Sequence, residues 1–85
     1  MSANSIRPEL INCLQGLESE YTNKHVKQVA RVMLMQIDNL INNVPELIED
    51  IHLLQQLTHG MGPWWADTKL KDIMTSLRSI NRSLI

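Results

Sequence analysis

The fold is decided by residues 24–44, which read KHVKQVARVMLMQIDNLINNV. Apolar side chains recur in this stretch at alternating spacings of four and three, at Val26, Ala30, Met33, Ile37, Leu40 and Val44. That spacing is typical of an α-helix with one buried face, because about 3.6 residues make one turn. The buried stripe is flanked by Val29, Leu34 and Ile41. The stretch therefore predicts an amphipathic helix over about residues 24–43.

The sequence Pro-Glu-Leu-Ile occurs twice, at residues 8–11 and again at 45–48. Proline is favoured in the first turn of a helix, where its missing N–H costs no hydrogen bond, and an acid after it suits the positive helix end. Each copy opens a run of apolar residues with helical spacing. We therefore predict helices over about residues 8–20 and 45–59, and we expect residues 1–5 to be disordered.

The joint between the first two predicted helices is weakly marked. Thr22 and Asn23 can cap a new helix, because a short side-chain oxygen accepts hydrogen bonds from the free N–H groups of a first turn. Neither Gly nor Pro interrupts the chain there, so one continuous helix through Thr22 is the alternative. Within the first helix, Gly16 indicates a close approach by another segment.

The second half of the chain is divided by Gly60 and by Gly62-Pro63, which end the third helix. Asp67 is the expected N-cap of a fourth helix over about residues 67–83. Its predicted inward face consists of Leu70, Ile73, Met74, Leu77, Ile80 and Leu84. No sustained period-two alternation predicts a strand. The chain is therefore predicted to be an all-α single domain, residues 1–85, built as a bundle of two αα-hairpins.

Formal charge alternates in sign from one predicted helix to the next. Residues 1–22 sum to −2, residues 23–42 to +2, residues 43–60 to −3 and residues 61–85 to +2. A single exposed ion pair contributes only about 0.2–1 kcal/mol, but the alternation disfavours like-signed neighbours. An up-down-up-down bundle satisfies it, and so does a dimer of two interlocked longer hairpins.

Size and composition place the chain among small soluble proteins. A domain of 85 residues buries only about 60–65% of its unfolded surface, so we expect homodimerisation to complete or extend the bundle. The longest apolar run, residues 32–35, is far shorter than the roughly 20 residues of a membrane span. Residues 1–5 lack the pattern of a signal peptide. With the single cysteine, Cys13, expected to be a small buried hydrophobe, these features predict a cytoplasmic protein.

No residue pattern predicts chemistry. His52 and His59 share one side of the third helix but lie seven residues apart, whereas helical metal ligands usually lie three or four apart; His25 is on another helix. The carboxylates fall on predicted polar faces or caps, with no nucleophile beside a base. We therefore expect no catalytic residue, no metal and no cofactor, and a protein that is not an enzyme.

The most unusual stretch of the sequence is Met61-Gly-Pro-Trp64-Trp65. Two interpretations compete for the tryptophans of this predicted loop. Either the rings cover the end of the core, or they anchor a partner, since Trp is enriched among the interface residues that contribute most of the binding free energy. Each interpretation can hold for one ring.

Apolar residues also lie outside the predicted buried stripes, at Val32 and Met35 on the second helix and at Leu53 and Leu57 on the third. Either the core is wider than one stripe, or these residues form an exposed patch of the kind that marks an interaction surface. Together with Met61, Trp64 and Trp65, they predict a non-enzymatic interaction module, of the adaptor, chaperone or anti-activator type, that binds a protein partner of unknown identity.

A basic stripe on the fourth helix, formed by Lys71, Arg78 and Arg82, gives the alternative from another class. Such a stripe predicts a small transcriptional regulator that binds nucleic acid through phosphate contacts. Three cations on a chain of net charge −1 are a small footprint for that role, and a solvated face paired with the acidic third helix is the favoured explanation.

Overall fold

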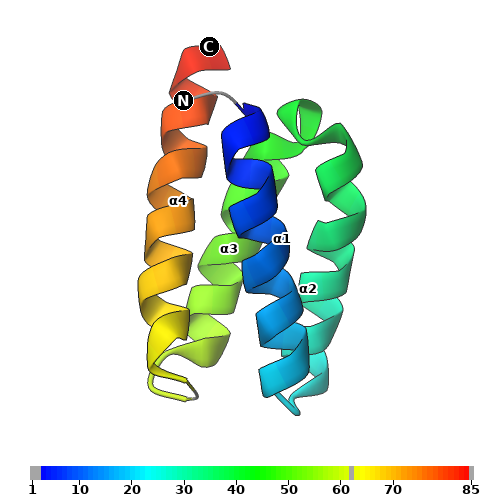
Figure 1. Cartoon of the computed structure of the whole chain (residues 1–85), viewed down its shortest axis with the longest axis vertical. Helices are drawn as coiled ribbons and strands as arrows, with labels where there is room; N and C mark the ends of the chain where they lie inside the picture. Colours follow the sequence, from blue (N-terminus) through cyan, green and yellow to red (C-terminus); the bar gives the residue numbers. More distant parts are fainter. Residues whose placement is uncertain (1–2, 62, 85) are drawn as a thin grey trace.

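Four α-helices and two short 3₁₀ turns make up the fold (Figure 1), seen in a computed structural model that describes residues 3–61 and 63–84. The elements are α1 (Ala3–Glu20), α2 (Lys24–Gln36), η1 (Ile37–Asn39), η2 (Ile41–Asn43), α3 (Val44–Thr58) and α4 (Trp64–Leu84). These residues contain no strand. The predicted all-α bundle of four helices is therefore confirmed.

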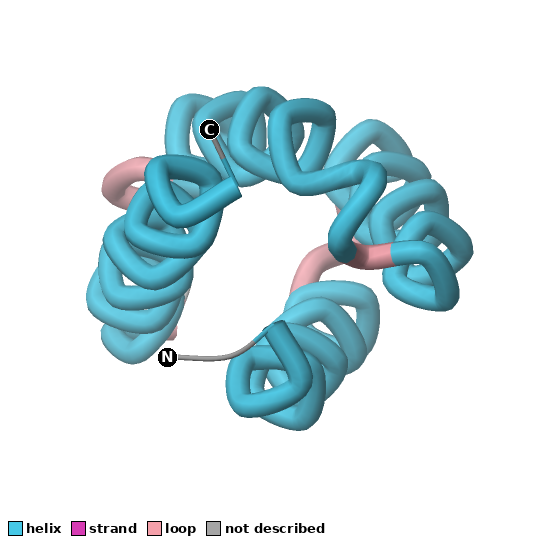
Figure 2. Tube along the Cα trace, turned by 90° about the horizontal axis from the view of Figure 1, so that it is seen from above, coloured by secondary structure: helices cyan, strands magenta, loops and turns pink. Residues whose placement is uncertain are grey.

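The helices follow one another around a ring. α1 and α3 run in one direction and α2 and α4 in the other (Figure 1), and the view from above shows the ring closing where α4 meets α1 (Figure 2). Every helix therefore lies between two neighbours of opposite formal charge, so this up-down-up-down bundle satisfies the charge alternation found in the sequence. Arg31 of α2 and Glu18 of α1 form an ion pair, with 2.7 Å between Nε and Oε1.

The first helix begins earlier than predicted. It starts at Ala3, so Pro8 lies inside α1 and not at its first position, and the expected disorder of residues 1–5 is wrong for residues 3–5. Residues 1 and 2 lie outside the described part of the chain. Pro8 removes only one hydrogen bond near the helix start, and Ile6, which is 1% exposed, holds the preceding turn against the core.

The chain breaks between α1 and α2. Residues 21–23 are not helical, and Asn23 is an N-cap in the extended conformation. Its side-chain oxygen accepts hydrogen bonds from the backbone N–H groups of His25, at 2.8 Å, and Val26, at 3.4 Å. The continuous helix through Thr22 is therefore excluded, and α1 and α2 form the first of the two predicted hairpins.

The second helix is shorter than predicted, because α2 ends at Gln36 and not near Asn43. Residues 37–43 form the two 3₁₀ turns η1 and η2, and the Asn43 side chain donates a hydrogen bond to the Gln36 carbonyl at 3.1 Å. A 3₁₀ turn advances by about 120° per residue instead of 100°, which rotates later side chains off the α-helical stripe. Ile37 and Leu40 stay buried, but Ile41 is 54% exposed, so its predicted place on the core stripe is wrong.

The third helix matches its prediction to within one residue at each end, with Pro45 in the first turn. Gly60 follows it with φ of +72°, a left-handed conformation that glycine adopts without strain. The fourth helix starts at Trp64, three residues before the predicted start, and Asp67 lies in its first turn instead of capping it. Leu84 ends α4 half exposed, so its predicted inward position is also wrong.

The core fills the centre of the ring with apolar side chains from all four helices. Leu14, Val26, Leu47, Leu54 and Leu77 are each fully buried. Thr58, a buried polar residue, donates its hydroxyl to the Leu54 carbonyl at 2.8 Å. Among the described residues, no helix combines the length and the apolar character needed to cross a bilayer.

Candidate protein-binding face between α2 and α3

The apolar residues that the sequence placed outside the core stripes lie on α2 and α3, which are neighbours in the ring. Val32 is 42% exposed and Met35 is 77% exposed, whereas Leu53 and Leu57 are partly buried and pack against the core. We call these four residues the α2–α3 face. Both sequence interpretations apply in part, because the leucines widen the core while Val32 and Met35 are open to solvent.

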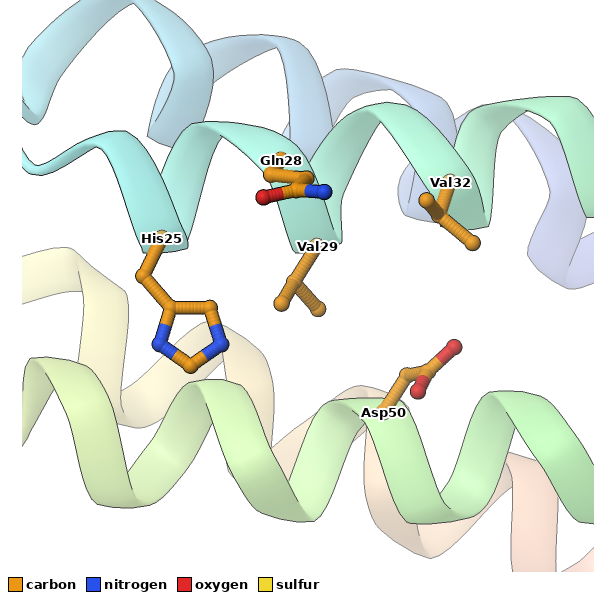
Figure 3. Close-up of a pocket in the computed structure, with 5 residues that line it drawn as sticks. All are labelled: His25, Gln28, Val29, Val32 and Asp50. Atoms are coloured by element: carbon orange, nitrogen blue, oxygen red, sulfur yellow. The ribbon is translucent and has the colours of Figure 1, made fainter.

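A shallow hollow of about 260 Å³ lies between the two helices (Figure 3). Its lining comes from one side of α2 and from a single residue of α3: His25, Gln28, Val29, Val32 and Asp50. His25 and Val29 point from α2 toward α3, and the carboxylate of Asp50 points from α3 toward Val32 (Figure 3). The hollow therefore places a carboxylate beside the exposed apolar side chain of Val32.

The carboxyl group of Asp50 determines the electrostatics of this hollow. Burial raises the pKa of its carboxyl, and the nearby carboxylates of Glu49 and Glu46 raise it further. In the described part of the chain no Lys, Arg or His lies within 4.0 Å of Asp50, and the single ion pair there is the one between α1 and α2. A half-buried carboxylate among other acids thus lacks a cation of its own.

Sequence reasoning missed Asp50 and His25 as members of this site. The signal was present, because Asp50 precedes Leu53 by three residues and Leu57 by seven, which puts all three on one side of α3. Asp50, Leu53 and Leu57 therefore form one arc on the surface of α3. Which neighbouring helix that arc would meet depends on the order of the helices around the ring.

The two tryptophans lie in the first turn of α4 and not in a loop. Trp64 is 87% exposed, and Met61 beside this end of the bundle is 59% exposed. Trp65 instead packs against the core and against α1, where a Cβ on Gly16 would be only 3.0 Å from its Cη2 atom. The interpretation that a ring covers the core is therefore confirmed for Trp65, whereas a partner contact stays a prediction for the exposed Trp64.

Trp65 also lines a hollow of about 230 Å³ between α1 and α4, on the side of the ring opposite the α2–α3 face. Cys13 lies at its base, 5% exposed, as the small buried hydrophobe that the sequence predicted. Burial raises the pKa of the Cys13 thiol to about 11, against a smaller lowering by Lys69. The thiol is protonated at neutral pH, so it is a poor nucleophile.

The histidines and the basic stripe are on the surface. His25, His52 and His59 are exposed, and the residues described include no cluster of three or more metal-ligating side chains. Lys71, Arg78 and Arg82 are exposed on α4 as well. Arg78 and Arg82 line a hollow of about 440 Å³ together with Asn81.

Comparison of the chain with protein-family models, curated proteins and solved structures finds no significant match. The α2–α3 face differs from the hollow between α1 and α4 and from the hollow at Arg78 and Arg82. Among the described residues, only beside the α2–α3 face do exposed apolar side chains lie next to an unpaired, half-buried carboxylate, that of Asp50.

Proposed function

We propose that this chain is a non-enzymatic protein–protein interaction module, an adaptor, chaperone or anti-activator type of regulator, that binds a protein partner through the α2–α3 face. The observation that carries the proposal is the exposure of Val32 and Met35 beside the half-buried Leu53 and Leu57. Burial of apolar surface contributes about 25 cal/mol per Å². A neighbouring pair of antiparallel helices also forms a groove that suits an amphipathic helix.

Two further elements belong to this proposal. Trp64 and Met61 expose large apolar side chains at one end of the bundle, and there they provide a second contact for a partner that extends past the face. Homodimerisation stays a prediction, on the ground that so small a core gains from added apolar contact. We place the module in the cytoplasm, where its free thiol at Cys13 is compatible with a reducing environment.

Replacing Val32 and Met35 by serine tests the proposal. We expect the double variant to bind its partner about 10–100-fold more weakly, since two apolar side chains contribute roughly 1.5–3 kcal/mol on burial. Both residues are exposed, so helicity and the melting temperature should change little. Light scattering over a range of concentrations measures self-association, and quantitative recovery from a lysate of the native host measures other partners.

The matched control is Ile41→Ser, which removes an equally exposed apolar side chain from η2. This variant should behave like the wild type in both measurements. Equal recovery and equal self-association for wild type and double variant would contradict a role for the α2–α3 face.

Nucleic-acid binding is the second candidate, and the exposure of Lys71, Arg78 and Arg82 on one helix is the observation that favours it. The stripe spans about 16 Å along α4, at 1.5 Å per residue. If this surface binds duplex DNA, affinity should fall steeply with salt, and Arg78→Gln with Arg82→Gln should lower the salt slope by about 2. Fluorescence anisotropy with a labelled duplex measures both effects, and absent or salt-insensitive binding rules the candidate out.

A further inference from the structure

The side chains of α2 and α3 face each other across the hollow in a definite register. Val32 lies level with Asp50 across the hollow (Figure 3). Because the helices are antiparallel and both rise 1.5 Å per residue, Met35 is level with Leu47, Leu53 is level with Val29, and Leu57 is level with His25. Met35 and Val32 thus lie toward the C-terminal end of α2, and Leu53 and Leu57 lie toward the C-terminal end of α3, at the opposite end of the face.

The apolar side chains therefore form a diagonal. It runs from Met35 and Val32 on α2 to Leu53 and Leu57 on α3. Its two ends, Met35 and Leu57, are about 15 Å apart along the helices and about 9 Å apart across them, the usual interaxial distance. A helix that touches all four residues would cross the groove at roughly 30°, within the range of common helix crossings, with Glu46 and Asp50 along one of its flanks.

A symmetric contact between the α2–α3 faces of two copies of this chain fits that flank poorly. The segment 43–60 has no Lys or Arg and a formal charge of −3, so stacking α3 on its own copy puts acid against acid. Stacking α3 on the partner's α2 offers Asp50 only the side that lines the hollow, which has valines, Gln28 and His25 and no Lys or Arg. Neither arrangement supplies a permanent cation to the unpaired carboxylate.

We propose that the occupant of the α2–α3 face is a basic amphipathic helix of another protein, a proposal that rests on the function proposed above. The helix lies along the apolar diagonal, and its lysine or arginine side chains pair with Asp50 and with the exposed Glu46. Asp50 is half-buried, so a cation placed over it is screened less than a surface pair is. The charge thus selects the partner, while the apolar diagonal provides most of the contact.

Two designed helical peptides of about 18 residues, long enough to span the groove, test this proposal. Both have leucines along one face; the flanking residues are lysines in one peptide and glutamates in the other. Isothermal titration against the full chain should show the lysine peptide binding at least tenfold more tightly. Asp50→Asn should weaken the lysine peptide about tenfold, and Glu46→Gln, at an exposed site, should weaken it less. Asp72→Asn, an exposed acid on α4, is the matched control and should bind like the wild type.

The outcomes separate this proposal from the function on which it rests. If Val32→Ser with Met35→Ser weakens both peptides equally while Asp50→Asn and Glu46→Gln have no effect, the face binds helices but the basic partner is wrong. A wild-type dimer that the serine variant dissociates, and that neither peptide displaces, would make a second copy the occupant. If neither peptide binds and no dimer forms, both proposals fail. Circular dichroism of each variant excludes misfolding as the cause.

Discussion

Leu54→Ala should lower the free energy of unfolding by about 3 kcal/mol. Leu54 is fully buried in the core, and removing a buried leucine loses its transfer free energy and leaves a cavity that the surrounding side chains fill only in part. For a domain of this size the melting temperature should fall by roughly 12–24 °C. Urea unfolding followed by far-UV circular dichroism measures the change.

The preceding residue provides the control for this prediction. Leu53 is the same amino acid, but it is only partly buried on the α2–α3 face, so Leu53→Ala should cost only about 1 kcal/mol. The same variant should weaken binding to that face. If the two alanine variants were equally stable, the assignment of Leu54 to the core and Leu53 to the surface would be wrong.

Trp65→Ala should lower the free energy of unfolding by about 2 kcal/mol, below the value for a fully buried ring because Trp65 is half-buried. Its indole fills the space that Gly16 leaves on α1, and alanine cannot fill it. Trp64→Ala should change stability by less than about 0.5 kcal/mol, since this ring is 87% exposed. Thermal unfolding of both variants gives the comparison.

Fluorescence provides a second measurement on the same pair of variants. Trp64→Ala leaves only the half-buried Trp65, so its emission should shift to longer wavelength when the protein unfolds. Trp65→Ala leaves only Trp64, whose emission should resemble that of indole in water before and after unfolding. Equal shifts in the two variants would contradict the placement of one ring on the core and the other in solvent.

Helical period was a sufficient guide to the core. The stripe from Val26 to Val44 is buried almost as predicted, and α3 is within one residue of its expected bounds. The capped start of α2 at Asn23 required only local hydrogen bonding, although the sequence left a continuous helix open. These features are determined by residues that are close together in the sequence, so they can be predicted from local sequence patterns.

Errors occurred where packing overrode a local rule. Pro8 was expected to start α1, but burial of Ile6 stabilises an earlier turn. The periodicity of residues 37–43 continues the α2 pattern, yet the chain tightens there into 3₁₀ turns and turns Ile41 outward. Gly and Pro suggested a loop up to Trp65, whereas the contact with Gly16 holds Trp65 in a helix.

The candidate face was partly predictable. Helical geometry alone identified Val32 and Met35 as apolar residues outside the core stripe, and both are exposed. It could not pair them with Asp50, because that pairing depends on α2 and α3 lying side by side. The four sequence-predicted residues of the face lie on these two neighbouring helices, while Met61 lies in the connection between α3 and α4 and Trp64 begins α4, at one end of the bundle.

The alternation of charge around the ring has a consequence for how the chain can assemble. Around a closed ring, the sign of the helix charge can alternate without a break only if the number of helices is even. A hairpin, which has two helices, can therefore be added or exchanged without making two helices of like sign neighbours, whereas a single helix cannot. A hairpin supplied by a second copy would meet the same signs as the chain's own hairpin, as in a domain-swapped dimer. The charges thus specify the order of helices around the ring, but not which molecule contributes each one.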